Sequence, residues 1–269
     1  MNENQQMIEI RALPAFDDNY IWLLRSNGHV AVVDPGDAAP VLAWLAQTGD
    51  KLCAILVTHH HGDHVGGLAA LRAHAPLPVP VFGPAAENIA GVSHPLFGGE
   101  HITLPELGLK LDVIAVPGHT RGHLAYYGAT LGDAAQGALF CGDTLFGAGC
   151  GRLFEGTPAQ MWASLAKLAV LPAPTFVYCA HEYTQNNLRF ASAVEPENAD
   201  IQRRSQEVAT ARRANQATVP TQIGVERATN PFLRWDAPTV IAAATARLGH
   251  APADAIETFA AIREWRNKF

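Results

Sequence analysis

The sequence lacks the marks of a disulfide-stapled protein and of a membrane protein. Its four cysteines lie far apart and form no C-x-x-C pair, so we expect reduced thiols. No apolar run approaches membrane-spanning length, and the opening MNENQQMIEIRALPAF has neither a basic start nor a long apolar core. We therefore expect a cytoplasmic protein without a membrane partner.

Positive charge is also scarce. Lysine and arginine together number 19 against 25 acidic residues, for a net charge of −6, which argues against a large nucleic-acid surface. There is no short-period repeat and no low-complexity tract, so solenoid and linker architectures are excluded. Hydrophobic residues make up 48% of the 269 positions, enough for a globular main domain and a smaller appended one.

Strand and helix signals alternate up to about residue 180. The dipeptide Asn27-Gly28 separates two short apolar runs and predicts a hairpin turn. Proline-rich stretches before residue 109 favour loops. We expect strands at 8–13, 20–24, 29–34, 52–57, 109–116, 124–127, 138–141 and 175–179, and helices at 38–47, 65–73 and 158–171. This mixture predicts an α/β sandwich.

The composition changes beyond about Tyr183. Runs of β-branched residues nearly vanish, and Ala, Arg, Gln and Glu dominate 188–217 and 240–265, which favours helices. We predict a mixed α/β domain over 1–182 and an all-α domain over 183–269.

A cluster of histidines follows the predicted strand 52–57. The segment 58–64 reads THHHGDH and holds four of the twelve histidines, with Asp63 among them. A tight loop leaving a strand can direct several imidazoles and a carboxylate into one pocket, and a metal of borderline softness needs such ligands. The spacing therefore predicts a metal site.

Three later predicted strands also end in ligand-type residues, namely His119, Asp143 and His181. Open α/β folds bind ligands at strand ends, so we expect these side chains to complete one site. Five imidazoles and two carboxylates are too many for one tetrahedral metal, whereas two metals sharing a carboxylate fit. Metals about 3.5–4 Å apart can hold hydroxide at neutral pH, which indicates a hydrolase.

The motifs THHHGDH, PGHTRGH, CGDTLF and AHEYT resemble, in order, those of the metallo-β-lactamase superfamily over residues 58–184. The resemblance implies a four-layer αβ/βα sandwich. It also implies that His60 points away from the metals and that His123 supports the loop. His29, His74, His94, His101 and His250 lack ligand neighbours in sequence, so we expect surface or core roles for them. The implied ligands are His59, His61 and His119 for metal 1, Asp63, His64 and His181 for metal 2, and Asp143 as the bridge.

Flanking segments narrow the resemblance. FDDNYIWLL, FCGDTLFGAGCGRLFEG, HEYTQNNLRFA and IREWRNKF are together similar to the glyoxalase II (hydroxyacylglutathione hydrolase) family over nearly the whole chain. This implies hydrolysis of S-D-lactoylglutathione to glutathione and D-lactate, the second step of methylglyoxal detoxification. The implied glutathione contacts are Arg152, Phe154, Tyr183, Arg263 and Arg266.

The same resemblance implies a mechanism and a cofactor. Asp63 and Asp143 would orient a bridging hydroxide as well as bind metal. The cofactor would be two divalent ions, Zn first, with Fe and Mn as alternatives, and we expect a monomer. Phe154 lacks the hydroxyl of the tyrosine found in some members. For Arg263 and Arg266, the alternative is a solvated helix face.

Four other functions compete with this interpretation. A persulfide dioxygenase would use one iron held by two His and one Asp, and the intact second ligand set argues against it. A nuclease would need a basic extension. A β-lactamase is disfavoured by the missing export signal and the long helical tail. A non-enzymatic binding protein would be expected to have lost ligands, whereas all seven positions are filled.

Overall fold

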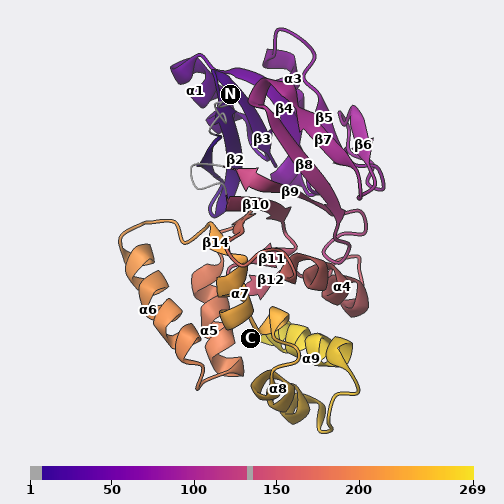
Figure 1. Ribbon diagram of the computed structural model, residues 1–269, viewed down its shortest axis with the longest axis vertical. Helices are drawn as coiled ribbons and strands as arrows, with labels where there is room; N and C mark the ends of the chain where they lie inside the picture. Colours follow the sequence, from indigo (N-terminus) through magenta and orange to yellow (C-terminus); the bar gives the residue numbers. More distant parts are fainter. Residues whose placement is uncertain (1–7, 132–135) are drawn as a thin grey trace, which may run out of the picture. The chain divides into compact units, whose positions relative to one another are not determined.

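The computed structural model describes residues 8–131 and 136–269. The chain forms two compact units, coloured along the sequence in Figure 1. Unit 1 comprises Met1–Ala115 and Gly122–Gly142, and unit 2 comprises Val116–Arg121 and Asp143–Phe269. These units are defined by contacts. The domain boundary predicted after residue 182 from the change in composition stays a prediction.

The first sheet of unit 1 has six strands in chain order. The first three pair antiparallel, and every later pair is parallel. The predicted hairpin turn is confirmed: Asn27 and Gly28 have φ of 48° and 71°, as a two-residue hairpin loop requires. The strands are β1 (Glu9–Ala15), β2 (Asn19–Ser26), β3 (His29–Val33), β4 (Lys51–Leu56), β5 (Val81–Pro84) and β6 (His94–Leu96).

Helices α1 (Ala38–Thr48) and α3 (Leu68–His74) cover one face of this sheet. Alternate residues of β2, Ile21 and Leu23, belong with Val41 and Leu71 to one buried apolar cluster. Side chains of a strand alternate between faces, so Trp22 and Leu24, which are also buried, belong to the opposite face. Both faces of the sheet are therefore covered.

Unit 1 contributes four consecutive antiparallel strands to the second sheet. Tyr126, on the third of these strands, is fully buried and donates its hydroxyl to the carbonyl oxygen of Val57 at 2.7 Å. That bond joins the second sheet to the end of β4. Helix, sheet and sheet thus form successive layers. The strands are β7 (His101–Leu104), β8 (Leu109–Ala115), β9 (Leu124–Leu131) and β10 (Gln136–Gly142), with the 3₁₀ turn η1 (Pro105–Leu107) before β8.

Unit 2 is mainly helical, and the helices predicted within 188–217 and 240–265 are confirmed. Helix α4 begins as its sequence requires, since Thr157 and Gln160 form a reciprocal capping box around Pro158. The helices and strands of unit 2 are β11 (Leu145–Phe146), β12 (Gly149–Cys150), α4 (Pro158–Ala169), β13 (Phe176–Cys179), α5 (Thr184–Val194), α6 (Ala199–Arg213), β14 (Thr221–Gln222), α7 (Ile223–Thr229), η2 (Pro231–Leu233), α8 (Pro238–Leu248) and α9 (Ala255–Lys268).

The structure departs from the sequence expectation in two places of unit 1. The helix predicted at 65–73 begins only at Leu68, as α3, and is preceded by the separate turn α2 (Gly62–Val65). The interruption lies at Gly67, whose amide donates to the Pro35 carbonyl oxygen at 2.9 Å instead of to the preceding helical turn. The proline-rich stretch before residue 109 holds β5, β6 and β7 instead of loops alone, since pairing with neighbouring strands outweighs weak local propensity. No helix in residues 8–131 or 136–269 is long and apolar enough to cross a membrane.

Candidate metal centre and substrate-binding residues

Unit 1 presents four predicted ligands from the loop that follows β4. His59 and His64 are completely buried. His59 Nε2 lies 3.0 Å from His61 Nδ1, and His64 Nε2 lies 3.5 Å from Asp63 Oδ2. Imidazole nitrogens and a carboxylate turned toward one another suit a bound divalent cation, which would interact with the buried lone pairs of these atoms in place of solvent. The chemistry of this ligand set fits a metal.

Asp34 supports this loop and was missed by the sequence analysis. Its Oδ1 accepts the Thr58 amide at 2.7 Å, and its Oδ2 accepts the Thr58 hydroxyl at 2.7 Å and lies 3.0 Å from His64 Nδ1. A carboxylate on one imidazole nitrogen fixes the tautomer and the orientation of the ring, and so directs the opposite nitrogen toward a metal site. The available signal was Asp-Pro-Gly, which begins at the last residue of the strand predicted at 29–34. Asp34 has φ of 52°, a strained conformation for a residue other than glycine.

His60 and His123 have the surroundings expected of supporting residues. His60 Nδ1 lies 2.9 Å from Glu87 Oε2, and Glu87 Oε1 accepts the Gly122 amide at 3.0 Å. The ring of His123 is buried and stacks on His59, with centroids 4.6 Å apart. The remaining predicted non-ligands are exposed or half-buried, namely His29, His74, His94, His101 and His250.

Unit 2 presents the other three predicted ligands around one carboxylate. Asp143 Oδ2 lies 3.4 Å from His119 Nε2, and Asp143 Oδ1 lies 3.3 Å from His181 Nε2. All three side chains are buried. Each oxygen of Asp143 thus faces a different imidazole. His119 Nδ1 lies 2.8 Å from the Arg152 carbonyl oxygen, a contact that orients the ring with Nε2 toward Asp143.

Two predicted substrate-binding aromatics lie against ligand histidines of unit 2. Phe154 is 61% exposed, and its ring meets His119 edge-on, with centroids 5.3 Å apart. Tyr183 stacks on His181 at 4.7 Å and 7°. The guanidinium of the exposed Arg152 lies 6.0 Å from the Phe154 ring. These three residues are therefore placed beside the ligand group of their own unit.

Arg152, Arg263 and Arg266 form the cationic cluster of unit 2, in which Arg263 is buried, Arg266 half-buried and Arg152 exposed. Arg263 is 7% exposed, so it does not lie on a solvated helix face, and it donates to the Cys150 carbonyl oxygen at 3.0 Å. Burial, together with the charges of Arg263 and Arg152, lowers the pKa of Arg266. Within the described part of the chain, no carboxylate forms an ion pair with Arg152, Arg263 or Arg266. Such a cluster suits an anion.

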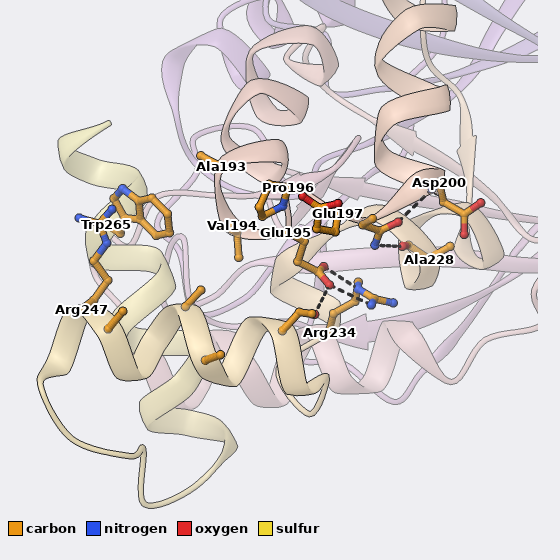
Figure 2. Close-up of a pocket in the computed structure, with 15 residues that line it drawn as sticks. Ala193, Val194, Glu195, Pro196, Glu197, Asp200, Ala228, Arg234, Arg247 and Trp265 are labelled. Carbon is orange, nitrogen blue, oxygen red and sulfur yellow. Dashed lines mark hydrogen bonds and ion pairs between the residues drawn. The ribbon is translucent and has the colours of Figure 1, made fainter.

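A separate cavity of unit 2 contains none of the predicted site residues. It has a volume of about 670 Å³ and is lined mainly by α8 and by the segment from the end of α5 to the start of α6 (Figure 2). Its polar wall is an ion pair in which Glu195 accepts from Arg234 at 2.7 and 3.0 Å. Alanines and Trp265 supply much of the remaining lining, so it offers none of the ligand chemistry described above.

Two family models together match residues 15–269. The model of the metallo-β-lactamase superfamily matches residues 15–181, and the model of the hydroxyacylglutathione hydrolase C-terminus matches residues 182–269. Proteins named hydroxyacylglutathione hydrolase from Cupriavidus taiwanensis and Nitrosomonas eutropha are 54% and 49% identical to the chain. Each alignment covers 98% of this chain and 100% of the relative. The chain belongs to the hydroxyacylglutathione hydrolase family.

Membership of this family confirms the resemblance, the α/β metallo-β-lactamase fold with its helical C-terminal part, and the assignment as a hydrolase. The names of these relatives favour a hydroxyacylglutathione hydrolase over the alternative of a persulfide dioxygenase. A solved structure, that of TTHA1623 in a di-iron-bound form, matches 84% of this chain and 100% of its own, with a TM-score of 0.56 and 26% identity. The His and Asp clusters fit binding of divalent metal.

Proposed function

We propose that the chain hydrolyses S-D-lactoylglutathione and related 2-hydroxyacylglutathiones to glutathione and the free hydroxy acid, the second step of methylglyoxal detoxification. The observation that carries the proposal is 54% sequence identity to a hydroxyacylglutathione hydrolase over 98% of the chain, together with the match of the C-terminal segment to the family model. The cationic cluster of unit 2 supports it, since glutathione has two carboxylates and arginine can bind such groups bidentately.

The ligand sets support two metal ions, and the relative with two bound irons supports the same number. We assign Asp143 to both ions, and we favour zinc, although imidazole and carboxylate ligands also accept iron and manganese. When bound, the ions would lower the pKa of a water toward about 7 and polarise the thioester carbonyl. The proposed ligands are His59, His61 and His119 for one ion, and Asp63, His64 and His181 for the other.

The chain's own residues would orient the reactants. The carboxylates of Asp63 and Asp143 would accept hydrogen bonds from the attacking water. Asp63 is itself held by Asn19, whose Nδ2 donates to Asp63 Oδ2 at 2.9 Å. Addition of the water oxygen to the thioester carbonyl carbon and cleavage of the C–S bond give D-lactate and glutathione thiol. Fixing the reactants in this way can supply several kcal/mol of the rate enhancement.

Glutathione binding would use the predicted residues in different ways. Arg152, Tyr183 and Arg266 are exposed or half-buried, and we propose that they contact the peptide directly, with Phe154 as an apolar wall. Arg263 would act through its charge, because its two terminal nitrogens already donate to Cys150 and Asn267.

Loss of thioester absorbance tests the proposal. Purified, metal-analysed protein is assayed with S-D-lactoylglutathione, with a simple thioester that lacks glutathione, and after treatment with EDTA. We expect rapid, chelator-sensitive loss that is selective for the glutathione thioester. Oxygen consumption with glutathione persulfide, without thioester cleavage, would instead establish the dioxygenase.

The state of the protein in the cell is also part of the proposal. On the sequence grounds above, we propose a cytoplasmic monomer that binds no nucleic acid. Light scattering of the purified protein and fractionation of cells test these points, and a dimer at micromolar concentration would refute the monomer.

A further inference from the structure

The hairpin formed by β11 and β12 is buried at every position from Leu145 to Cys150. It has two residue pairs, Leu145 with Cys150 and Phe146 with Gly149. So short a ladder leaves most of its backbone N–H and C=O groups without partners inside the hairpin. Because buried backbone polar groups require hydrogen bonds, these groups depend on the rest of unit 2.

Side chains of helices α5, α7 and α9, and of Asn230 directly after α7, supply those hydrogen bonds. Figure 1 shows the ribbons of these helices and of the hairpin. Four side chains satisfy five backbone groups of the hairpin. The amide of Ala148 donates to Glu226 Oε2 at 2.7 Å, Asn230 Nδ2 donates to the carbonyl oxygens of Phe146 at 3.3 Å and Gly149 at 2.9 Å, Asn187 Nδ2 donates to that of Gly147 at 3.0 Å, and Arg263 Nη1 donates to that of Cys150 at 3.0 Å.

Glu226 is the centre of this support. Its carboxylate is completely buried, and Oε2 also accepts from Asn230 Nδ2 at 2.9 Å. The other oxygen accepts from Arg204 at 2.6 Å and from the Thr221 hydroxyl at 2.8 Å. A buried carboxylate held by donors on both oxygens has one orientation, and removing its charge leaves several buried donors facing the wrong group.

Both ends of the hairpin contact the ligand group of unit 2. Asp143 lies two residues before it, and the carbonyl oxygen of Arg152, two residues after it, lies 2.8 Å from His119 Nδ1. There is little slack between the hairpin and its support, since a Cβ on Gly149 would lie 2.3 Å from Asn187 Nδ2. A shift of the hairpin would therefore move one ligand and the group that orients another.

We propose that Glu226, together with Asn230, is a positioning residue for the metal centre, and that the helices of unit 2 keep Asp143 and His119 in ligand geometry as well as supplying arginines. The inference rests on the proposed metal centre, but it does not depend on which thioester is the substrate. Substitution of a residue that holds a metal ligand in place typically lowers metal affinity or activity by about 10–100-fold.

The test compares two substitutions of the same kind. Glu226→Gln keeps the size of the side chain, but its amide can accept hydrogen bonds on one side only. Glu195→Gln is the matched control: Glu195 is 2% exposed, is paired with Arg234 as Figure 2 shows, and makes none of the hydrogen bonds to the hairpin. Both substitutions remove a buried carboxylate that faces an arginine in unit 2.

Zinc affinity of each folded protein is measured by competition with a chromophoric chelator, and the thermal midpoint is recorded alongside. We expect both variants to lose stability, but only Glu226→Gln to lose about 10–100-fold in zinc affinity. Equal zinc affinities of the two variants would overturn the proposal. Failure of the wild type to cleave S-D-lactoylglutathione would reject the proposed substrate and leave this comparison intact.

If Glu226→Gln does not fold, two less disruptive substitutions test the same proposal. Asn187→Ala removes one hydrogen bond to the hairpin, whereas Asn198→Ala removes a comparable bond to the Ala228 carbonyl oxygen and the cap of α6. We expect zinc affinity to fall by roughly tenfold in Asn187→Ala and to be retained in Asn198→Ala. Equal affinities in this pair would also overturn the proposal.

Discussion

The two units present their proposed metal ligands in different ways. In unit 1, four ligands come from one loop of six residues, 59–64, held from outside by Asp34 and Asn19. In unit 2, three ligands come from three distant segments, and helix side chains hold the hairpin next to one of them. A compact loop is specified largely by local sequence, whereas the second group depends on long-range packing. Substitutions in the two units should therefore differ in how far their effects spread.

The largest effect is expected at the carboxylate of unit 2. Asp143→Ala removes the oxygens that face both His119 and His181, so we expect loss of both metals. The metals are expected to stabilise the transition state by several kcal/mol, so their loss should lower kcat/KM by a factor on the order of 10³ or more. Asp63→Ala, in unit 1, should remove one metal only. Metal analysis with the assay checks both variants, and near-normal turnover in Asp143→Ala would end the bridging assignment.

The next effect concerns the support of the unit 1 loop. Asp34→Asn weakens the acceptor that faces His64 Nδ1 and the Thr58 groups. We expect zinc affinity to fall about 10–100-fold. Asp112→Asn is the control, because Asp112 pairs with the exposed His101 at 2.6 Å on the surface. Chelator competition measures both, and an unchanged affinity in Asp34→Asn would show that the loop is fixed by its backbone alone.

The sequence predicted what is local and missed what depends on packing. The loop 58–64 and the turn at Asn27-Gly28 are written in adjacent residues, and the strands before His119 and Asp143 were visible as apolar runs. Asp34 looked like the end of a strand, because its partners are 24 and 30 residues away. Likewise, the burial of Arg263 depends on a contact with Cys150, 113 residues away in the chain. No local pattern reports such contacts.

A smaller effect separates substrate binding from metal binding within unit 2. Arg266→Met removes one charge of the cationic cluster while keeping an unbranched, flexible side chain like the aliphatic part of arginine. We expect KM for the glutathione thioester to rise roughly tenfold, as for loss of one charge-assisted hydrogen bond, with zinc content unchanged. Arg203→Met, on the exposed face of α6, is the control. Steady-state kinetics at two salt concentrations measure the difference, and an equal KM in both variants would remove Arg266 from the binding site.

The smallest effect is expected at Phe154. Its ring is 61% exposed and lies against the edge of His119, so an added hydroxyl at its outer end need not enter the core. Phe154→Tyr supplies a donor that could reach the peptide, and one neutral hydrogen bond contributes about 0.5–1.5 kcal/mol. We expect KM for the glutathione thioester to fall by roughly 2–10-fold, with kcat and the rate on a simple thioester unchanged. Because this substitution leaves the metal ligands and the hairpin untouched, a change in zinc affinity would mean that substrate and metal binding in unit 2 are not separable.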